Sequence, residues 1–114
     1  MAELAADPDA LFADLVDAFA DRPGVTPPAE GDSRFGSAAL QVNGAIFAMI
    51  TRGRLVVKLP SRRVAALIAA GTGAPFDANR GLPMKQWLTV VGTDAATWRA
   101  LAEEALEHVR ATHA

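Results

Sequence analysis

Few residues of this chain are able to carry acid–base or metal chemistry. The two histidines, His108 and His113, are five positions apart and point about 140° apart on a helix, so they cannot share a metal ion. The absence of cysteine excludes thiolate zinc modules, iron–sulfur clusters, thiol redox chemistry and disulfide scaffolds. No serine has a partner base at a suggestive spacing, and no carboxylate pair lies at ligand spacing beside a histidine. We therefore predict a protein without catalytic residues, cofactor or metal.

One pair of charges stands where helix electrostatics disfavours it. Arg62 and Arg63 fall in the first turn of a helix predicted after Pro60, where the helix dipole favours acidic side chains. With Ser61 and the unpaired backbone N–H groups, they would attract a phosphate or a carboxylate. The alternative is that one arginine pairs with an acidic first helix while the other points into water. The sequence leaves both interpretations open.

The charges of the chain are arranged in blocks. Residues 1–32 contain eight acidic side chains and one arginine, whereas residues 33–92 contain eight basic side chains and one aspartate. Such asymmetry is found on nucleic-acid-binding surfaces. It also arises when an acidic helix lies beside a basic sheet edge, and the net charge of −2 favours this second interpretation.

Three helices are predicted from capping signals and apolar spacing. The first begins with Asp7 as cap and Pro8 in the first turn, and it ends at Pro23-Gly24. The second begins with Ser61 as cap and ends at Gly71, and the third begins with Asp94 as cap. Residues 22–33 contain three prolines and are predicted to form a loop.

The middle of the chain predicts an antiparallel meander. Strands are expected at 38–42, 45–51 and 54–59, joined by tight turns at Asn43-Gly44 and Arg52-Gly53, and a last strand is expected at 85–91. Strict alternation from these turns pairs Val42 with Ala45, Leu40 with Phe47, Ile50 with Leu55, and Met49 with Val56. The core face would then carry Ile46, Ala48, Ile50, Leu55, Val57 and Leu59.

The opposite sheet face is predicted to be apolar at its centre, which is unusual for a face in contact with water. That patch consists of Leu40, Phe47, Met49 and Val56. A contiguous apolar patch indicates a partner protein, a homodimer, or a helix of the same chain lying across it.

Two groups of basic residues are candidates for binding an anion. A basic rim consists of Arg52, Arg54, Lys58, Arg62 and Arg63, and it is the candidate surface for nucleic acid. A small-molecule or anion site would instead lie near Arg80, Lys85 and Trp87, next to the long loop 71–83.

Length and hydropathy bound the organisation of the chain. Its 114 residues predict one domain, 1–114, with a core large enough to fold without disulfides or metal. No apolar run approaches the ~20 residues that span a bilayer. The first residues show no basic segment followed by an apolar one, so we expect a cytoplasmic protein without membrane contact.

The central motifs resemble a known family. The segments Arg34-Phe35-Gly36, Leu40-x-Val42-Asn43-Gly44-x-Ile46-Phe47-Ala48-Met49 and Gly53-x-Leu55-Val56-Val57-Lys58-Leu59 are similar to the N-terminal domain of the TfoX/Sxy competence regulators. Further segments resemble the family members that consist of this domain alone: Arg63-Val64, Gly71-x-Gly73, Phe76 and Pro83-Met84-Lys85-Gln86-Trp87. Those members typically have Glu where this chain has Gln86. The resemblance covers residues 8–110, and the first and last helices match only in pattern.

The resemblance implies an α+β fold with the order helix, three antiparallel strands, helix, two strands, helix, similar to YjbR-like and secretion-chaperone-like folds. It implies no catalytic residues, and the chain ends without the additional C-terminal helical domain of the full-length regulators. YjbR-like proteins are often labelled DNA-binding, but no recognition helix is evident here. The sequence thus predicts a non-enzymatic module, with a possible regulatory role, that contacts a protein or a second copy of itself. Binding of nucleic acid through the basic rim is the first alternative, and binding of an anion near Arg80 and Lys85 is the second.

Overall fold

The computed structural model describes residues 7–28, 38–76 and 85–112 of the chain. Within them, the helices are α1 (Pro8–Phe19), α2 (Ser61–Ala69) and α3 (Ala95–Thr112). The strands are β1 (Val25–Thr26), β2 (Ala38–Val42), β3 (Ala45–Thr51), β4 (Arg54–Lys58), β5 (Gly73–Pro75) and β6 (Trp87–Val90). They form one antiparallel sheet in the order β1-β2-β3-β4-β6-β5. The predicted α+β class is confirmed, and the short strand β1 lies where only a loop was predicted.

The capping residues explain where the helices begin. The Asp7 carboxylate accepts a 3.4 Å hydrogen bond from the backbone N–H of Asp9, and Asp94 accepts bonds from the N–H and the hydroxyl of Thr97 at 2.9 and 2.7 Å. These two predicted caps are therefore confirmed. The predicted cap at Ser61 is wrong, because Pro60 occupies the cap position of α2 and makes no side-chain capping bond.

Both hairpin turns have the predicted tight form. Asn43 and Gly44 have φ of 51° and 85°, and Arg52 and Gly53 have φ of 54° and 75°. Two successive residues with positive φ are typical of a type I′ turn, whose twist matches that of the flanking strands. The predicted pairs Val42 with Ala45, Ile50 with Leu55, and Met49 with Val56 follow from these turns and are confirmed.

A β-bulge in β3 changes which side chains face the core. Leu40 pairs with Ala48 and Gln41 pairs with Ile46, so Phe47 is an extra residue with no partner on β2. Phe47 and Ala48 consequently both enter the core, and strict alternation resumes only from Ala48 onward.

The bulge overturns part of the predicted assignment of faces. Leu40 and Phe47 are fully buried in the core rather than on the opposite face, and Val42 accompanies them. Ile46, predicted in the core, is 36% exposed instead. The predicted core positions Ala48, Ile50, Leu55, Val57 and Leu59 are confirmed, because all of them follow the bulge.

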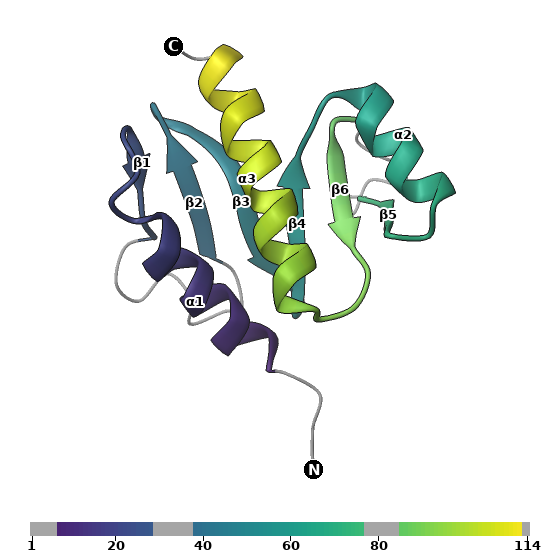
Figure 1. Cartoon of the computed structure of the whole chain (residues 1–114), viewed down its shortest axis with the longest axis horizontal. Coiled ribbons are helices and arrows are strands. Elements are labelled where there is room, and N and C mark those ends of the chain that lie inside the picture. Colours follow the sequence, from purple (N-terminus) through teal and green to yellow (C-terminus); the bar gives the residue numbers. More distant parts are fainter. Residues whose placement is uncertain (1–6, 29–37, 77–84, 113–114) are drawn as a thin grey trace.

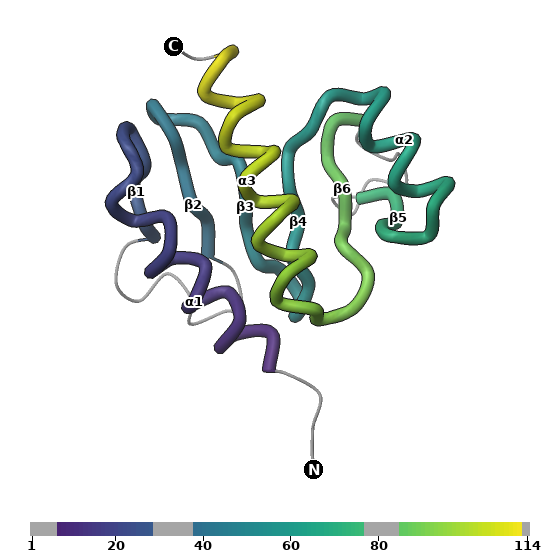
Figure 2. Tube along the Cα trace, viewed as in Figure 1, coloured from purple at the N-terminus to yellow at the C-terminus, as the bar shows by residue number. Residues whose placement is uncertain are grey.

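The helices and the sheet form two layers. In Figure 1, α1 and α3 lie on the same face of the sheet; α3 packs against β2, β3 and β4, and α2 packs against β5 and β6 at the other end. The Cα trace in Figure 2 follows α1 beside α3 on this face. The core between the layers includes Phe12, Phe19 and Trp98. No helix in the described part of the chain is long and apolar enough to cross a membrane.

Candidate functional site

The sheet face turned away from α1 and α3 is the main unexplained surface of the molecule. We call it the helix-free face, since no helix among the residues described in Figure 1 lies across it. Strand pairing places one continuous row of side chains across its middle: Ala39, Met49, Val56, Thr89 and Ala74. The pair Thr51–Arg54 lies on one side of that row, and the pair Lys58–Trp87 lies on the other.

A groove of about 470 Å³ is sunk into the helix-free face. Its lining residues come from β3, β4, β5 and β6 and the adjoining turns: Thr51, Arg52, Arg54, Val56, Ala74, Pro75, Phe76 and Thr89. Its volume falls in the range of about 300–1,000 Å³ that is usual for small-molecule pockets. We call it the sheet-face groove.

One residue that lines the sheet-face groove, Thr89, is polar and largely buried. Thr89 is 9% exposed, and its side chain makes no hydrogen bond within the described residues. It lies beside Val56, which is fully buried yet outside the helix-facing core. Burying a hydroxyl without a partner costs about 1–3 kcal/mol in proteins, so a hydrogen-bonding ligand in the groove would recover part of that cost.

The charged side chains of the helix-free face are basic. Arg54 is exposed, and its guanidinium has no carboxylate partner in the described part of the chain. Lys58 holds its ammonium 5.6 Å from the centroid of the Trp87 ring, a cation–π contact, and Trp87 in turn lies 6.4 Å from Phe76. Basic and aromatic side chains are thus neighbours on this face.

In the part of the chain that the structure describes, acidic side chains lie only on the helical side. Among the described residues, every carboxylate belongs to α1, to α3 or to a position next to one of them: Asp7, Asp9, Asp14, Asp17, Asp21, Asp94, Glu103, Glu104 and Glu107. The described strands contain no acidic residue. Within the described residues, the helical layer is therefore net acidic despite the arginines of α2 and α3, whereas the strands carry only basic charges.

The predicted anion site at the start of α2 is only partly available. Arg63 forms two 2.9 Å hydrogen bonds to the Glu104 carboxylate on α3, and these bonds raise the pKa of Arg63. Arg62 is exposed. The alternative in which one arginine is paired therefore describes the structure, but the partner comes from α3 rather than from α1.

The predicted apolar interaction patch is smaller than expected. Leu40 and Phe47 belong to the core, so of the four predicted residues only Met49 and Val56 are on the helix-free face. Met49 is partly exposed and Val56 is buried, while Ile46 joins the exposed apolar surface at 36%. The bulge therefore removes apolar side chains from the proposed docking surface. It does not change the positions of the basic side chains on the helix-free face.

Only part of the predicted site near Arg80, Lys85 and Trp87 lies within the described residues. Arg80 lies outside the described residues. Lys85 and Trp87 line an apolar hollow of about 240 Å³ together with Ser61, Val64, Ala65, Ile68 and Pro75. This hollow lies between α2 and the end of the sheet, and it shares Pro75 with the sheet-face groove.

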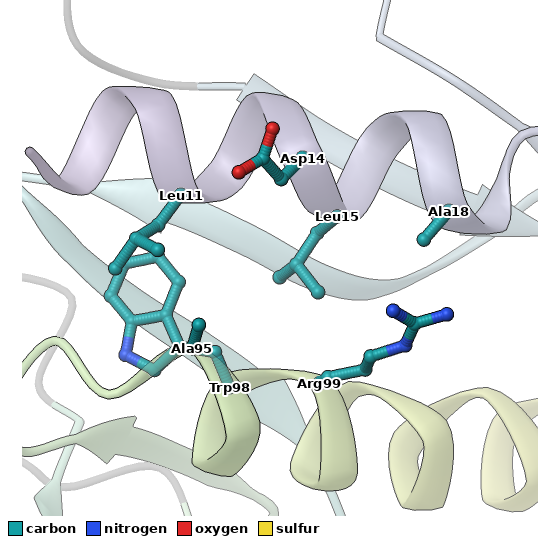
Figure 3. A pocket seen from close by; sticks show the side chains of 7 residues that line it. All are labelled: Leu11, Asp14, Leu15, Ala18, Ala95, Trp98 and Arg99. Carbon is teal, nitrogen blue, oxygen red and sulfur yellow. The ribbon is translucent and has the colours of Figure 1, made fainter. Parts of the chain in front are cut away.

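A cleft of about 170 Å³ lies between α1 and α3. Figure 3 shows Leu11, Leu15 and Trp98 in its wall, with the Arg99 guanidinium reaching from α3 toward α1. The Asp14 carboxylate points away from Arg99, so this cleft has no paired polar groups that could grip a ligand. It is a packing defect between two helices.

The described residues contain no group of three or more side chains suited to hold a metal ion. His108 lies on α3, and His113 falls outside the residues that the structure describes. Sequence reasoning missed Thr89 and Phe76 as groove residues. Only pairing across strands distant in sequence places Thr89 diagonal to Arg54 and Phe76 at the opposite end of the groove, and nothing in the local pattern signals either position.

Comparison with family models, with curated proteins and with solved structures finds no match for this chain. The resemblance to the TfoX/Sxy N-terminal domain therefore stays a prediction.

Proposed function

We propose that this chain is a non-enzymatic binding module whose helix-free face contacts an acidic surface of another protein. The observation that carries the proposal is the separation of charge between the layers: the helix-free face presents Arg54 and Lys58, and the described strands hold no carboxylate. A partner surface rich in Asp and Glu would be attracted to this face and repelled by the helical layer. A regulatory role of the kind implied by the TfoX/Sxy resemblance fits such a module.

The apolar residues of the same face support a protein partner. Met49 and Ile46 expose apolar area beside the basic side chains, the mixture that is usual for a transient protein interface. A purely electrostatic surface would not need them.

Titration of the full chain with polyglutamate, a model for an acidic protein surface, tests the proposal. We expect saturable binding that weakens as salt is raised and that the double variant Arg54→Glu/Lys58→Glu abolishes. The matched control is Arg99→Glu, which makes the same charge change per site on the helical layer. Absence of binding by the native chain, or an equal loss in the control, would show the proposal to be wrong.

Single-stranded nucleic acid is the second candidate partner. It is favoured by one observation, the neighbouring aromatic rings of Phe76 and Trp87 next to Lys58, because bases stack on aromatic side chains along a basic track. An oligothymidine titration separates the two candidates. Tighter binding of the oligonucleotide than of polyglutamate at equal charge would favour nucleic acid.

A further inference from the structure

We propose that the sheet-face groove binds a small aromatic phosphate monoester, the chemistry of a mononucleotide. The phosphate would lie between Arg54 and Thr89, and the ring would lie against Phe76. This inference goes beyond the proposed function and does not depend on it.

The polar end of the groove is set by strand pairing. Thr51 is directly opposite Arg54, a position that brings Cβ atoms to about 4.5–5.5 Å. Thr89 is opposite Val56 and therefore diagonal to Arg54, at about 7–8 Å, within reach of an arginine side chain. The Arg54 guanidinium and the Thr89 hydroxyl can thus converge on a single group. Thr51 lies two strand spacings, about 10 Å, from Thr89, so its hydroxyl is too distant to bind the same group as Thr89.

Those donors suit a phosphate monoester. A monoester carries a charge of about −1.5 to −2 at neutral pH and offers three acceptor oxygens, and an arginine fork matches two of them. The Thr89 hydroxyl, which has no hydrogen-bond partner within the described residues, can donate to the third. None of the described residues that line the groove is a carboxylate, so none of them would repel the anion.

The other end of the groove is apolar and aromatic. Pro75 and Phe76 follow Ala74 on the outer strand of the sheet, toward the level of Trp87 and Lys58. From Arg54 to that level is four residues along β4, about 13 Å. An inorganic phosphate would occupy only the Arg54 end, whereas an aromatic ring linked to the phosphate would also fill the space beside Phe76.

The experiment is a calorimetric titration of the full chain with AMP, phenyl phosphate, inorganic phosphate, adenosine and benzoate. We expect AMP and phenyl phosphate to bind at least about tenfold more tightly than the other three compounds, because only these two contain both a phosphate group and an aromatic ring. Equal binding of inorganic phosphate or of benzoate would overturn the proposed ligand class, and no binding of AMP would overturn the site.

Variants place the ligand in the groove. Thr89→Val and Arg54→Gln should each weaken AMP binding about fivefold or more, the effect of losing one good hydrogen bond to a charged group. Phe76→Leu should weaken AMP binding but not that of inorganic phosphate. Arg99→Gln is the control for Arg54→Gln, since it removes one positive charge from the helical layer. An effect of Arg99→Gln as large as that of Arg54→Gln would overturn the placement.

A hexathymidine strand distinguishes the two sources of such a ligand. If AMP binds and displaces the hexathymidine, the groove binds a nucleotide whether it is free or part of an oligonucleotide, and the proposal holds. If the strand binds and AMP does not, the groove is no small-molecule site and the proposal is wrong. Polyglutamate titrations of the same samples test the contact function separately, so either proposal can fail while the other stands.

Discussion

Arg22 and Glu103 are 81 residues apart and face each other through two hydrogen bonds of 2.7 Å. The arginine follows α1 and the glutamate lies on α3, so this pair connects the end of one helix to the middle of another. The same guanidinium lies 4.8 Å from the centroid of the Phe19 ring, at the edge of the core. Arg22 is therefore held on two sides, by a carboxylate and by an aromatic face.

The ion pair predicts a pH dependence of stability. The hydrogen bonds that Arg22 donates to the Glu103 carboxylate lower the pKa of Glu103 and raise the pKa of Arg22, so pairing favours the ionised carboxylate. A carboxyl whose pKa is lower in the folded state stabilises the fold above its unfolded pKa. That contribution is lost as the pH falls through the folded pKa. In urea unfolding, Glu103→Gln should therefore be less stable than the native chain at pH 7.

At pH values below the folded pKa of Glu103, both proteins are uncharged at this position and the difference should close. The matched control is Glu107→Gln, which removes a carboxylate of the more exposed Arg110 pair. A difference between the native chain and Glu103→Gln that stays constant down to acid pH would contradict the assignment.

Because of the bulge in β3, the neighbouring residues Ile46 and Phe47 should contribute differently to the free energy of unfolding. Phe47→Ala should lower the free energy of unfolding by about 3–5 kcal/mol, because Phe47 is fully buried against Phe19. Ile46→Ala should cost less than about 1 kcal/mol, because Ile46 is 36% exposed on the other face. Chemical unfolding of the two variants measures both. A larger loss of stability in Ile46→Ala than in Phe47→Ala would contradict the bulge, because it would mean that Ile46 faces the core, as strict alternation predicts.

The sequence predicts most of the fold because its strongest local signals agree with the tertiary structure. The turns at Asn43-Gly44 and Arg52-Gly53 set the register on either side of β3, and proline and capping aspartates mark the starts of α1 and α3. The bulge could not be predicted. The run from Ala45 to Ile50 is apolar at every position, so no polar residue reveals where alternation breaks.

The candidate site was predicted less completely because long-range pairing creates it. The basic residues of β4 were identified from their charge, but Thr89 belongs to a strand of mostly apolar residues and reaches Arg54 only through the β4–β6 pairing. The partner of Arg63 was likewise hidden, because Glu104 is 41 positions away. Local patterns contain no information on either contact.

Gly73 is a second place where close packing can be tested. A Cβ at this position would overlap Cδ1 of Leu88, a core residue on the neighbouring strand β6. Gly73→Ala should therefore destabilise the chain by about 1–3 kcal/mol through overpacking. The test is a double-mutant cycle with Leu88→Ala, in which Gly73→Ala should cost clearly less once the leucine is shortened. Equal costs in the two backgrounds would show that the clash is not with Leu88.

The last prediction concerns the hydroxyl of Thr89. Because Thr89 is only 9% exposed and its hydroxyl has no partner within the described residues, Thr89→Val removes a polar group from a largely buried position at nearly constant volume. We expect the ligand-free chain to gain about 0.5–1 kcal/mol in unfolding free energy, a fraction of the penalty for an unsatisfied buried group. Thr97→Val is the matched comparison. Its hydroxyl donates a 2.7 Å hydrogen bond to Asp94 and contributes most to lowering the pKa of that carboxyl, so this variant should be destabilised instead.

Urea unfolding should therefore show a gain of stability in Thr89→Val and a loss in Thr97→Val. This difference would distinguish a hydroxyl that is available to a ligand from one that stabilises the fold. A loss of stability in Thr89→Val would mean that the hydroxyl already has a partner in the free protein. In that case the groove would offer a ligand one hydrogen-bond donor fewer, and the preference for a phosphate with three acceptor oxygens over a carboxylate would lose its physical basis.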